Sequence, residues 1–135
     1  MGMTTADAVA VAEFRSALRV FLRRSERIAR KSGLTPQRYL LLLMVKGAPG
    51  GGEQSTVTEL AERLQLAQST VTELVSRAEA AGLIAREQSQ SDARVAYLRL
   101  TGEGERRLEL AFTALGTERA QLRDVIAQLD TDSIG

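Results

Sequence analysis

The 135-residue sequence contains no cysteine, no histidine and no tryptophan. Without cysteine there is no disulfide framework, no thiol redox sensor and no thiol nucleophile, and without histidine there is no Ser-His-Asp relay. A metal site built on imidazole or thiolate is excluded for the same reason, and no stretch has the acidic spacing of a calcium loop. Only carboxylate or Ser/Lys chemistry remains, and no such pairing is visible. We therefore expect a protein that is not an enzyme and has no cofactor.

Long hydrophobic runs are also missing. No segment approaches the length of a membrane span or the apolar core of a signal peptide. The N-terminal MGMTTA has Ala6 where a myristoylation signal requires serine or threonine. A cytoplasmic location is the expectation. The hydrophobic fraction of 44% and the charged fraction of 26% are ordinary for a globular protein, and the length suits one domain with an added oligomerisation element.

The formal net charge is only +1, but the charges are unevenly distributed. Residues 1–31 carry seven basic and three acidic side chains, whereas residues 102–135 carry four basic and seven acidic ones. Sixteen of the 18 cations are arginine. Arginine suits bidentate contacts to phosphate or guanine, although a GC-rich genome produces the same bias and in our interpretation explains most of it.

Helical periodicity begins near the N-terminus. An apolar stripe at intervals of three and four predicts a helix over residues 7–31, and consists of Phe14, Leu18, Phe21, Ser25 and Ile28. A second helix is expected over residues 37–46, with Thr35 as N-cap and Pro36 at the first helical position. Its run of leucines favours burial on several faces. Residues 47–54, GAPGGGEQ, lack the Gly-Lys-Ser/Thr of a phosphate loop and are interpreted as a flexible spacer.

Residues 56–101 predict two short helices and a β-hairpin. Thr56 and Glu59 have the spacing of a capping box at the start of the first helix. Residues 65–67 turn into a second helix over residues 68–81, which Gly82 ends. Its inward face consists of Val71, Leu74, Val75 and Ala78. Residues 83–88 and 95–100 have β-type composition and flank the polar tip SQSDAR. This order is the plan of a winged helix-turn-helix.

Two more helices are predicted, over residues 103–115 and 118–129. Their apolar residues fit one heptad seam, which consists of Leu108, Phe112, Leu115, Leu122, Ile126 and Leu129. Such a seam needs a partner, and with the N-terminal stripe we expect it to build a homodimer interface through Phe14, Leu18, Phe21, Leu115, Leu122, Ile126 and Leu129. The expected fold is mainly α: an N-terminal dimerisation helix (residues 1–34), a winged helix-turn-helix DNA-binding domain (35–101) and C-terminal dimerisation helices (102–135).

The outward face of residues 68–81 is polar. A recognition helix needs such a face near its N-terminal end, where glutamine can pair with adenine and a threonine methyl can touch a thymine methyl. Arg77, further along, is suited to backbone phosphate. The candidate DNA-binding residues are Gln68, Ser69, Thr70, Thr72, Glu73, Ser76 and Arg77. The alternative is a core helix with a solvated polar face, which the capped helix before it and the hairpin after it disfavour.

The hairpin tip carries Asp92 and Arg94. In a winged helix-turn-helix this hairpin is the wing, and a guanidinium at its tip suits the narrow minor groove of A·T-rich DNA. Asp92 is expected to orient Arg94 or to brace the turn. Arg86 and Arg99 lie on the strands and are predicted to contact phosphate or to brace the hairpin. The alternative for the tip is a simple surface ion pair, worth a few tenths of a kcal/mol.

These fragments stand in a fixed order: ELAERL, STVTELVSRAEAAGLIAR, DAR and LRLTGEG. The residues that carry the pattern are Glu59-Leu60-Ala61, Thr70-Val71-Thr72, Gly82-Leu83-Ile84, Arg86, Asp92, Arg94, Leu100-Thr101 and Gly104. The ordered set resembles the MarR family of bacterial transcription regulators, and the likeness extends to the flanking helices. The resemblance implies a homodimer that binds a pseudo-palindromic operator, usually as a repressor. It also implies release by a small phenolic or lipophilic effector that enters a pocket between the DNA-binding and dimerisation parts.

Two positions depart from the family pattern. Glu73 stands where the family often has arginine or lysine, so one phosphate contact is missing; its carboxylate can instead accept from a cytosine amino group. Ala67 replaces the usual polar N-cap, which forfeits about 1 kcal/mol of capping. The lack of cysteine excludes the thiol-oxidation mode of some members, and the lack of histidine argues against a zinc-sensing mode.

A second hypothesis is a helical dimeric adaptor that uses the same scaffold for protein–protein contact. Glu73 and Glu79 against Arg77 give the second helix of the motif a net charge of −1, which favours this reading. Salt dependence separates the two, because DNA binding weakens steeply with salt through counterion release. The effector pocket cannot be read from the sequence. Its candidate lining residues are Phe14, Tyr39, Tyr97 and Phe112, although scattered aromatics more often belong to a core.

Overall fold

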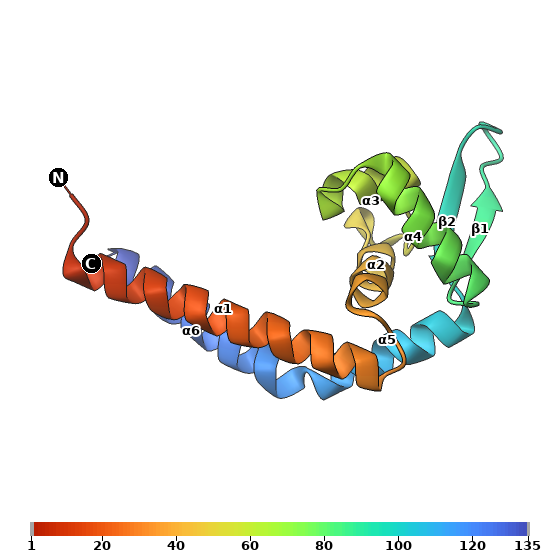
Figure 1. Ribbon diagram of the computed structural model, residues 1–135. Helices are drawn as coiled ribbons and strands as arrows, with labels where there is room; N and C mark the ends of the chain where they lie inside the picture. The colour runs from red at the N-terminus through yellow and green to blue at the C-terminus, as the bar shows by residue number, and fades with distance from the viewer. Residues whose placement is uncertain (1, 135) are drawn as a thin grey trace.

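The computed structural model describes residues 2–134, and the side chains of residues 2–129. Two long helices, α1 (Thr5–Lys31) and α6 (Gly116–Ile134), lie side by side and form an arm. The remaining elements form a head at one end of the arm (Figure 1). None of the helices described is both long and apolar enough to cross a lipid bilayer.

Helix α1 begins two residues before the predicted start because a capping box holds it there. The Thr4 side chain accepts from the Asp7 amide, and the Asp7 carboxylate accepts from the Thr4 amide, each at 3.0 Å. The helix ends where predicted, and Gly33 follows with φ +79°. Helix α6 begins at Gly116, two residues before the prediction, and continues past residue 129.

The head starts with α2 (Pro36–Lys46), which Thr35 caps as predicted by accepting from the Arg38 amide. The glycine-rich segment that follows contains a short 3₁₀ turn, η1 (Pro49–Gly51). It leads to α3 (Val57–Leu64) and α4 (Gln68–Ala80). At the start of α3 the Thr56 hydroxyl accepts from the Glu59 amide at 3.2 Å. The predicted capping box is wrong in one detail, because the Glu59 carboxylate accepts from the Thr56 hydroxyl at 3.0 Å.

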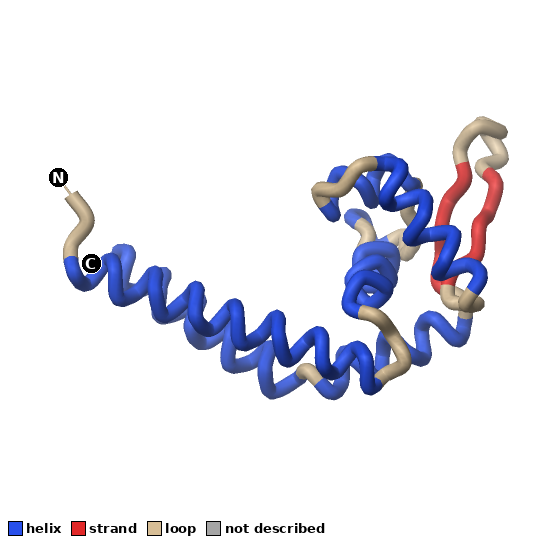
Figure 2. The backbone as a smooth tube through the Cα atoms, viewed as in Figure 1, coloured by secondary structure: helices blue, strands red, loops and turns tan. Residues whose placement is uncertain are grey.

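An antiparallel hairpin follows, formed by β1 (Ile84–Gln88) and β2 (Ala96–Leu100), each starting one residue later than predicted. Ile84 lies opposite Leu100, and Gln88 lies opposite Ala96. The two strands stand out beside the helices in Figure 2. Ser55 adds a short bridge to Leu98, with two backbone hydrogen bonds of 3.1 and 2.8 Å. The bridge attaches the residues just before α3 to the hairpin.

Helix α5 (Gly102–Ala114) joins the hairpin to the arm. One continuous core packs α5 against the other elements of the head. Its largest members are Leu34, Leu41, Leu42, Val45, Leu60, Val71, Leu74, Val75, Leu83, Ile84, Leu98 and Leu108. The four predicted inward residues of α4 are all buried. The core also reaches Ala29 and Leu34 before residue 35 and Leu108 after residue 101, so the head is anchored on the helices that flank it. Winged helix-turn-helix architecture is confirmed.

Candidate nucleic-acid interface

The turn between α3 and α4 sets how α4 is presented. Gln65 adopts a left-handed conformation with φ 56° and ψ 46°, which ends α3. The Leu66 amide then donates to the Ala61 carbonyl at 3.0 Å, a bond that closes the last turn of α3. Val71 and Val75 are fully buried against the head. Because this inner face is fixed by packing, the opposite face of α4 has a defined outward direction.

All seven predicted DNA-binding residues of α4 are exposed, from Gln68 at its start to Arg77 in its last turns. Gln68 is tied to the neighbouring helix, since its amide nitrogen donates to the Thr58 hydroxyl at 3.3 Å. As predicted, Ala67 provides no side-chain cap. The first backbone N–H groups of α4 therefore keep free hydrogen-bonding capacity at the end where a phosphate favours them.

Glu73 and Arg77 form an ion pair one turn apart on this exposed face. The Arg77 guanidinium donates to the Glu73 carboxylate at 2.6 Å, and each side chain is 63% exposed. The positive charge predicted for a phosphate contact is thus balanced by an acid of the same helix.

The two strand arginines also have acidic partners. Arg86 on β1 donates to Glu79 on α4 at 2.7 Å, which connects the wing to the end of that helix. Arg99 on β2 lies 3.4 Å from Glu87 and donates to the Gln54 side chain at 3.1 Å. Both arginines act as braces in this structure, which is one of the two roles predicted for them.

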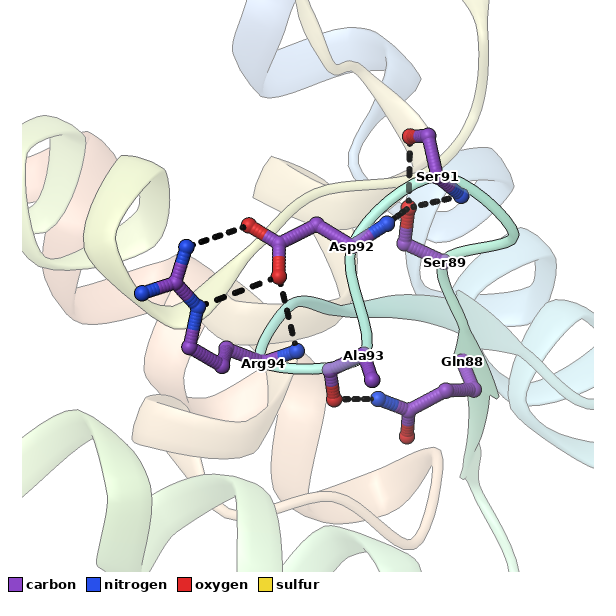
Figure 3. A network of polar contacts seen from close by, with 6 residues as sticks. All are labelled: Gln88, Ser89, Ser91, Asp92, Ala93 and Arg94. Carbon is purple, nitrogen blue, oxygen red and sulfur yellow. Dashed lines mark hydrogen bonds and ion pairs between the residues drawn. The ribbon is translucent and has the colours of Figure 1, made fainter.

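The wing tip is a turn closed by Asp92 (Figure 3). One Asp92 carboxylate oxygen accepts from the Arg94 amide at 3.0 Å and from the Arg94 guanidinium at 3.2 Å. Ser89 contacts Ser91 and the Asp92 amide, and the Gln88 side chain donates to the Ala93 carbonyl. The hydrogen bonds from the Arg94 side chain and amide hold the pKa of Asp92 below its ordinary value, because they favour the ionised carboxylate. The Arg94 side chain is nevertheless 91% exposed. The turn therefore fixes the backbone of Arg94, while the guanidinium group remains accessible to solvent.

A groove of about 240 Å³ separates the wing from the start of α3. Thr56 and Thr58 line one side, and Arg86, Arg94 and Val95 line the other. The sequence predicted both arginines but not the threonines, of which Thr56 was assigned only as a helix cap. The pattern Thr-x-Thr across a helix start was the available signal, since it places two hydroxyls on the first turn. In the part of the chain that the structure describes, no cluster of acidic residues could hold a metal ion.

A sequence model described as the MarR family matches residues 32–95, which span the head from α2 to the wing tip. Over these residues the chain is similar to the MarR family. No match is found among curated protein sequences. Two solved structures that carry this family name, one of them AbsC, are described as regulators of transcription.

Solved structures extend this likeness to most of the chain. YusO from Bacillus subtilis is 26% identical, covers 95% of this chain and 99% of its own, and superposes with a TM-score of 0.64. AbsC, a MarR family transcriptional regulator from Streptomyces coelicolor, is 23% identical over 96% of this chain and 84% of its own, with a TM-score of 0.65. A mutant MepR from S. aureus, bound to an oligodeoxyribonucleotide, is 18% identical and superposes with a TM-score of 0.68. The match covers 93% of this chain and 97% of the MepR chain.

The arm of this chain differs from the sequence prediction. The apolar stripe of α1 and the seam of α6 were expected to need a second chain, but the two helices pack against each other within one chain. Leu115 is only 1% exposed, because it lies at the corner between α5 and α6 and packs inward. Its assignment as a dimer contact is therefore corrected to the chain's own core. Phe14, Leu18, Phe21, Leu122 and Leu129 are half-buried, and Ile126 is 41% exposed.

Other large apolar side chains of the arm and of α5 remain open to solvent. Phe112 is 51% exposed, with the Arg119 guanidinium 3.7 Å above its ring. The remaining exposed members include Val9, Val11, Val20, Leu22 and Leu110. A monomer rarely leaves so many large apolar groups uncovered on neighbouring helices.

A pocket of about 220 Å³ lies where α1 meets α2. Its walls are mainly apolar and include Leu22, Pro36, Tyr39 and Leu40. Burial raises the pKa of the Tyr39 phenol above its ordinary value. Of the four aromatic residues predicted to line an effector pocket, Tyr39 lies here. Leu41, Leu42 and Val45 of α2 are fully buried, in line with the predicted burial on several faces, whereas Leu40 is 41% exposed beside this pocket.

Proposed function

We propose that this protein is a homodimeric, sequence-specific DNA-binding transcription regulator, and that residues 35–101 are its DNA-binding part. One observation carries the proposal: the uncharged outward residues of α4 and the exposed Arg94 guanidinium lie on neighbouring projections of one rigid core. That arrangement suits a helix in the major groove and a wing in the adjacent minor groove. Gln68, Ser69, Thr70 and Thr72 then contact base edges, and Ser76, Arg77, Arg86 and Asp92-braced Arg94 follow the backbone and the minor groove.

The dimer is supported by the apolar residues left open on the arm. A second copy covers them, and a two-fold axis then presents two heads to DNA. Two-fold symmetry predicts a pseudo-palindromic operator with half-site centres about one helical turn, or a multiple of it, apart. A dimer seated on such an operator excludes polymerase, so we infer a repressor that works where the chromosome is, in the cytoplasm. Analytical ultracentrifugation should give twice the 14.6 kDa mass of the chain. A monomer at micromolar protein concentration would contradict the symmetric dimer.

Regulation by a small molecule is the further part of the proposal. The pocket beside Tyr39 is small for a drug-sized ligand, but it is apolar and has one phenol and the nearby Ser25 and Glu26 as polar groups. A small phenolic or lipophilic effector fits this chemistry. It lies between arm and head, so its binding alters how the two heads are spaced.

The decisive experiment is selection of duplexes from a randomised pool, followed by affinity measurements with the recovered sequence at several salt concentrations. We expect a palindromic consensus and a steep loss of affinity with salt. An adaptor that binds protein through the same scaffold would recover no consensus and would show little salt dependence.

Arg94→Ala tests the wing. We expect it to weaken operator binding by about 1–3 kcal/mol, or roughly 5- to 150-fold, because it removes one groove contact. Arg106→Ala on α5 is the matched control, since it removes an exposed guanidinium that pairs with Glu103. An Arg94→Ala dimer that folds normally and binds the operator with wild-type affinity would remove the wing from the interface.

A further inference from the structure

The predicted DNA-facing part of the chain has no surplus positive charge. Residues 68–100 contain four arginines and four acidic residues. Each arginine lies against one of the acids: Arg77 with Glu73 at 2.6 Å, Arg86 with Glu79 at 2.7 Å, Arg94 with Asp92 at 3.2 Å and Arg99 with Glu87 at 3.4 Å. Non-specific affinity for DNA comes almost entirely from unbalanced cations that displace counterions from phosphates. This surface is therefore built for weak non-specific binding.

Glu73 differs from the other three acids in what it does for the fold. Asp92 closes the wing turn, and Glu79 and Glu87 connect neighbouring elements of the wing and α4. Glu73 contacts Arg77 on its own helix, with both side chains 63% exposed. An exposed pair at this spacing adds only about 0.3–0.5 kcal/mol to a helix. The contribution of Glu73 to fold stability is therefore too small to explain why position 73 carries a carboxylate.

The position of Glu73 on α4 indicates a role in DNA recognition instead. Glu73 lies on the outward face of α4, one residue after Thr72 and one turn before Arg77. A carboxylate there meets the edges of bases. The cytosine and adenine amino groups both donate in the major groove, but adenine places the acceptor N7 beside its amino group, so cytosine is the usual partner of a carboxylate. Next to guanine or thymine the carboxylate has no donor in the groove except Arg77.

We propose that Glu73 is a specificity-determining residue that acts through Arg77. On arbitrary duplex the pair stays closed, and Arg77 displaces no counterion. On the operator a cytosine amino group replaces Arg77 as the donor to Glu73, and the freed guanidinium contacts phosphate. The inference depends on the DNA-binding function proposed above.

Glu73→Gln tests it, because the amide keeps the shape and removes the charge. Affinity for random-sequence duplex should rise between about twofold, the strength of the pair itself, and about eightfold per protomer at 0.1 M salt, the worth of one full phosphate contact. The slope of log K against log salt should steepen by up to about 0.9 per protomer. Operator affinity should stay level or fall, so the ratio of operator to random affinity decreases.

Two controls separate this mechanism from a simple change in net charge. Glu109→Gln, at an exposed position on α5, makes the same charge change away from α4 and the wing. It should leave the affinities for operator and for random duplex unchanged. In an Arg77→Gln background the Glu73→Gln effect on random duplex should vanish. The inference is overturned if random-duplex affinity does not rise, if operator affinity rises equally, or if the rise persists without Arg77. A wild-type protein that recovers no duplex from a randomised pool would instead refute the DNA-binding function.

Discussion

Gly104, in the first turn of α5, touches the base of the hairpin so closely that it has no room for a side chain. A β-carbon on Gly104 would lie 2.2 Å from the Leu83 carbonyl oxygen and 3.1 Å from the Leu83 carbonyl carbon. These are backbone atoms already held in place. The Leu83 carbonyl accepts from the Thr101 amide, and the Leu83 amide donates to the Ala78 carbonyl, each at 3.0 Å. The junction joins α4, the hairpin and α5.

Gly104→Ala should therefore destabilise the protein. Non-bonded carbon atoms pack best at about 3.5–4.0 Å, so the methyl group forces α5 and the hairpin base apart by roughly 1 Å. Such overpacking typically costs about 1–3 kcal/mol. The higher helix propensity of alanine offsets roughly 0.5–1 kcal/mol of that cost. We expect the free energy of unfolding to fall by about 1–2 kcal/mol.

Gly102→Ala is the matched control, two residues earlier in the same turn. Nothing lies within 4 Å of a β-carbon at Gly102, so alanine should be neutral or stabilise by up to about 1 kcal/mol. Urea unfolding followed by circular dichroism, at one fixed protein concentration, compares the midpoints of the two variants. Equal stability of Gly104→Ala and Gly102→Ala would show that the Leu83 carbonyl leaves room for a methyl group on Gly104.

Two more predictions concern carboxylates with lowered pKa values. The pKa of Asp92 should lie below its ordinary 3.8 because Arg94 donates to the ionised form, so NMR titration of Arg94→Gln should return it towards 3.8; an unchanged value would separate the two residues. The pKa of Glu103 lies at about 2 instead of 4.5, through hydrogen bonds first from Arg106 and then from Arg107. A folded-state pKa below the unfolded one stabilises the fold above pH 4.5, and that contribution is lost as the pH falls to about 2. The stability difference between wild type and Glu103→Gln should thus shrink over that range, and a constant difference in acid unfolding curves would contradict the assignment.

Much of the head follows from local patterns. The inner face of α4 was predictable because Val71, Leu74, Val75 and Ala78 recur at the period of a helix that packs on one side. Thr35, Thr56 and Gly82 marked helix ends correctly, because capping depends on neighbours within four residues. The hairpin was recognisable from composition and a polar tip. The wing contact of Asp92 with Arg94 was also local, since the two residues are separated by one position.

Other features needed the tertiary structure. Gln68 bonds to Thr58 and Arg86 bonds to Glu79 because α4 lies beside α3 and β1. Neither contact leaves a periodic signal in the sequence. The position of Gly104 against Leu83 is of the same kind, because it depends on where α5 leaves the hairpin. The arm shows the clearest difference, since its two apolar stripes were visible but their pairing within one chain was not.

The sequence alone therefore determined the elements, their order and which face of each helix is apolar, because these properties depend on spacing along the chain. The tertiary structure alone decided which apolar face meets which, that Leu115 belongs to the core, and that Arg86 and Arg99 stand against carboxylates of neighbouring elements. Those facts depend on the approach of segments far apart in the chain. A repeat of three or four residues carries no information about that approach.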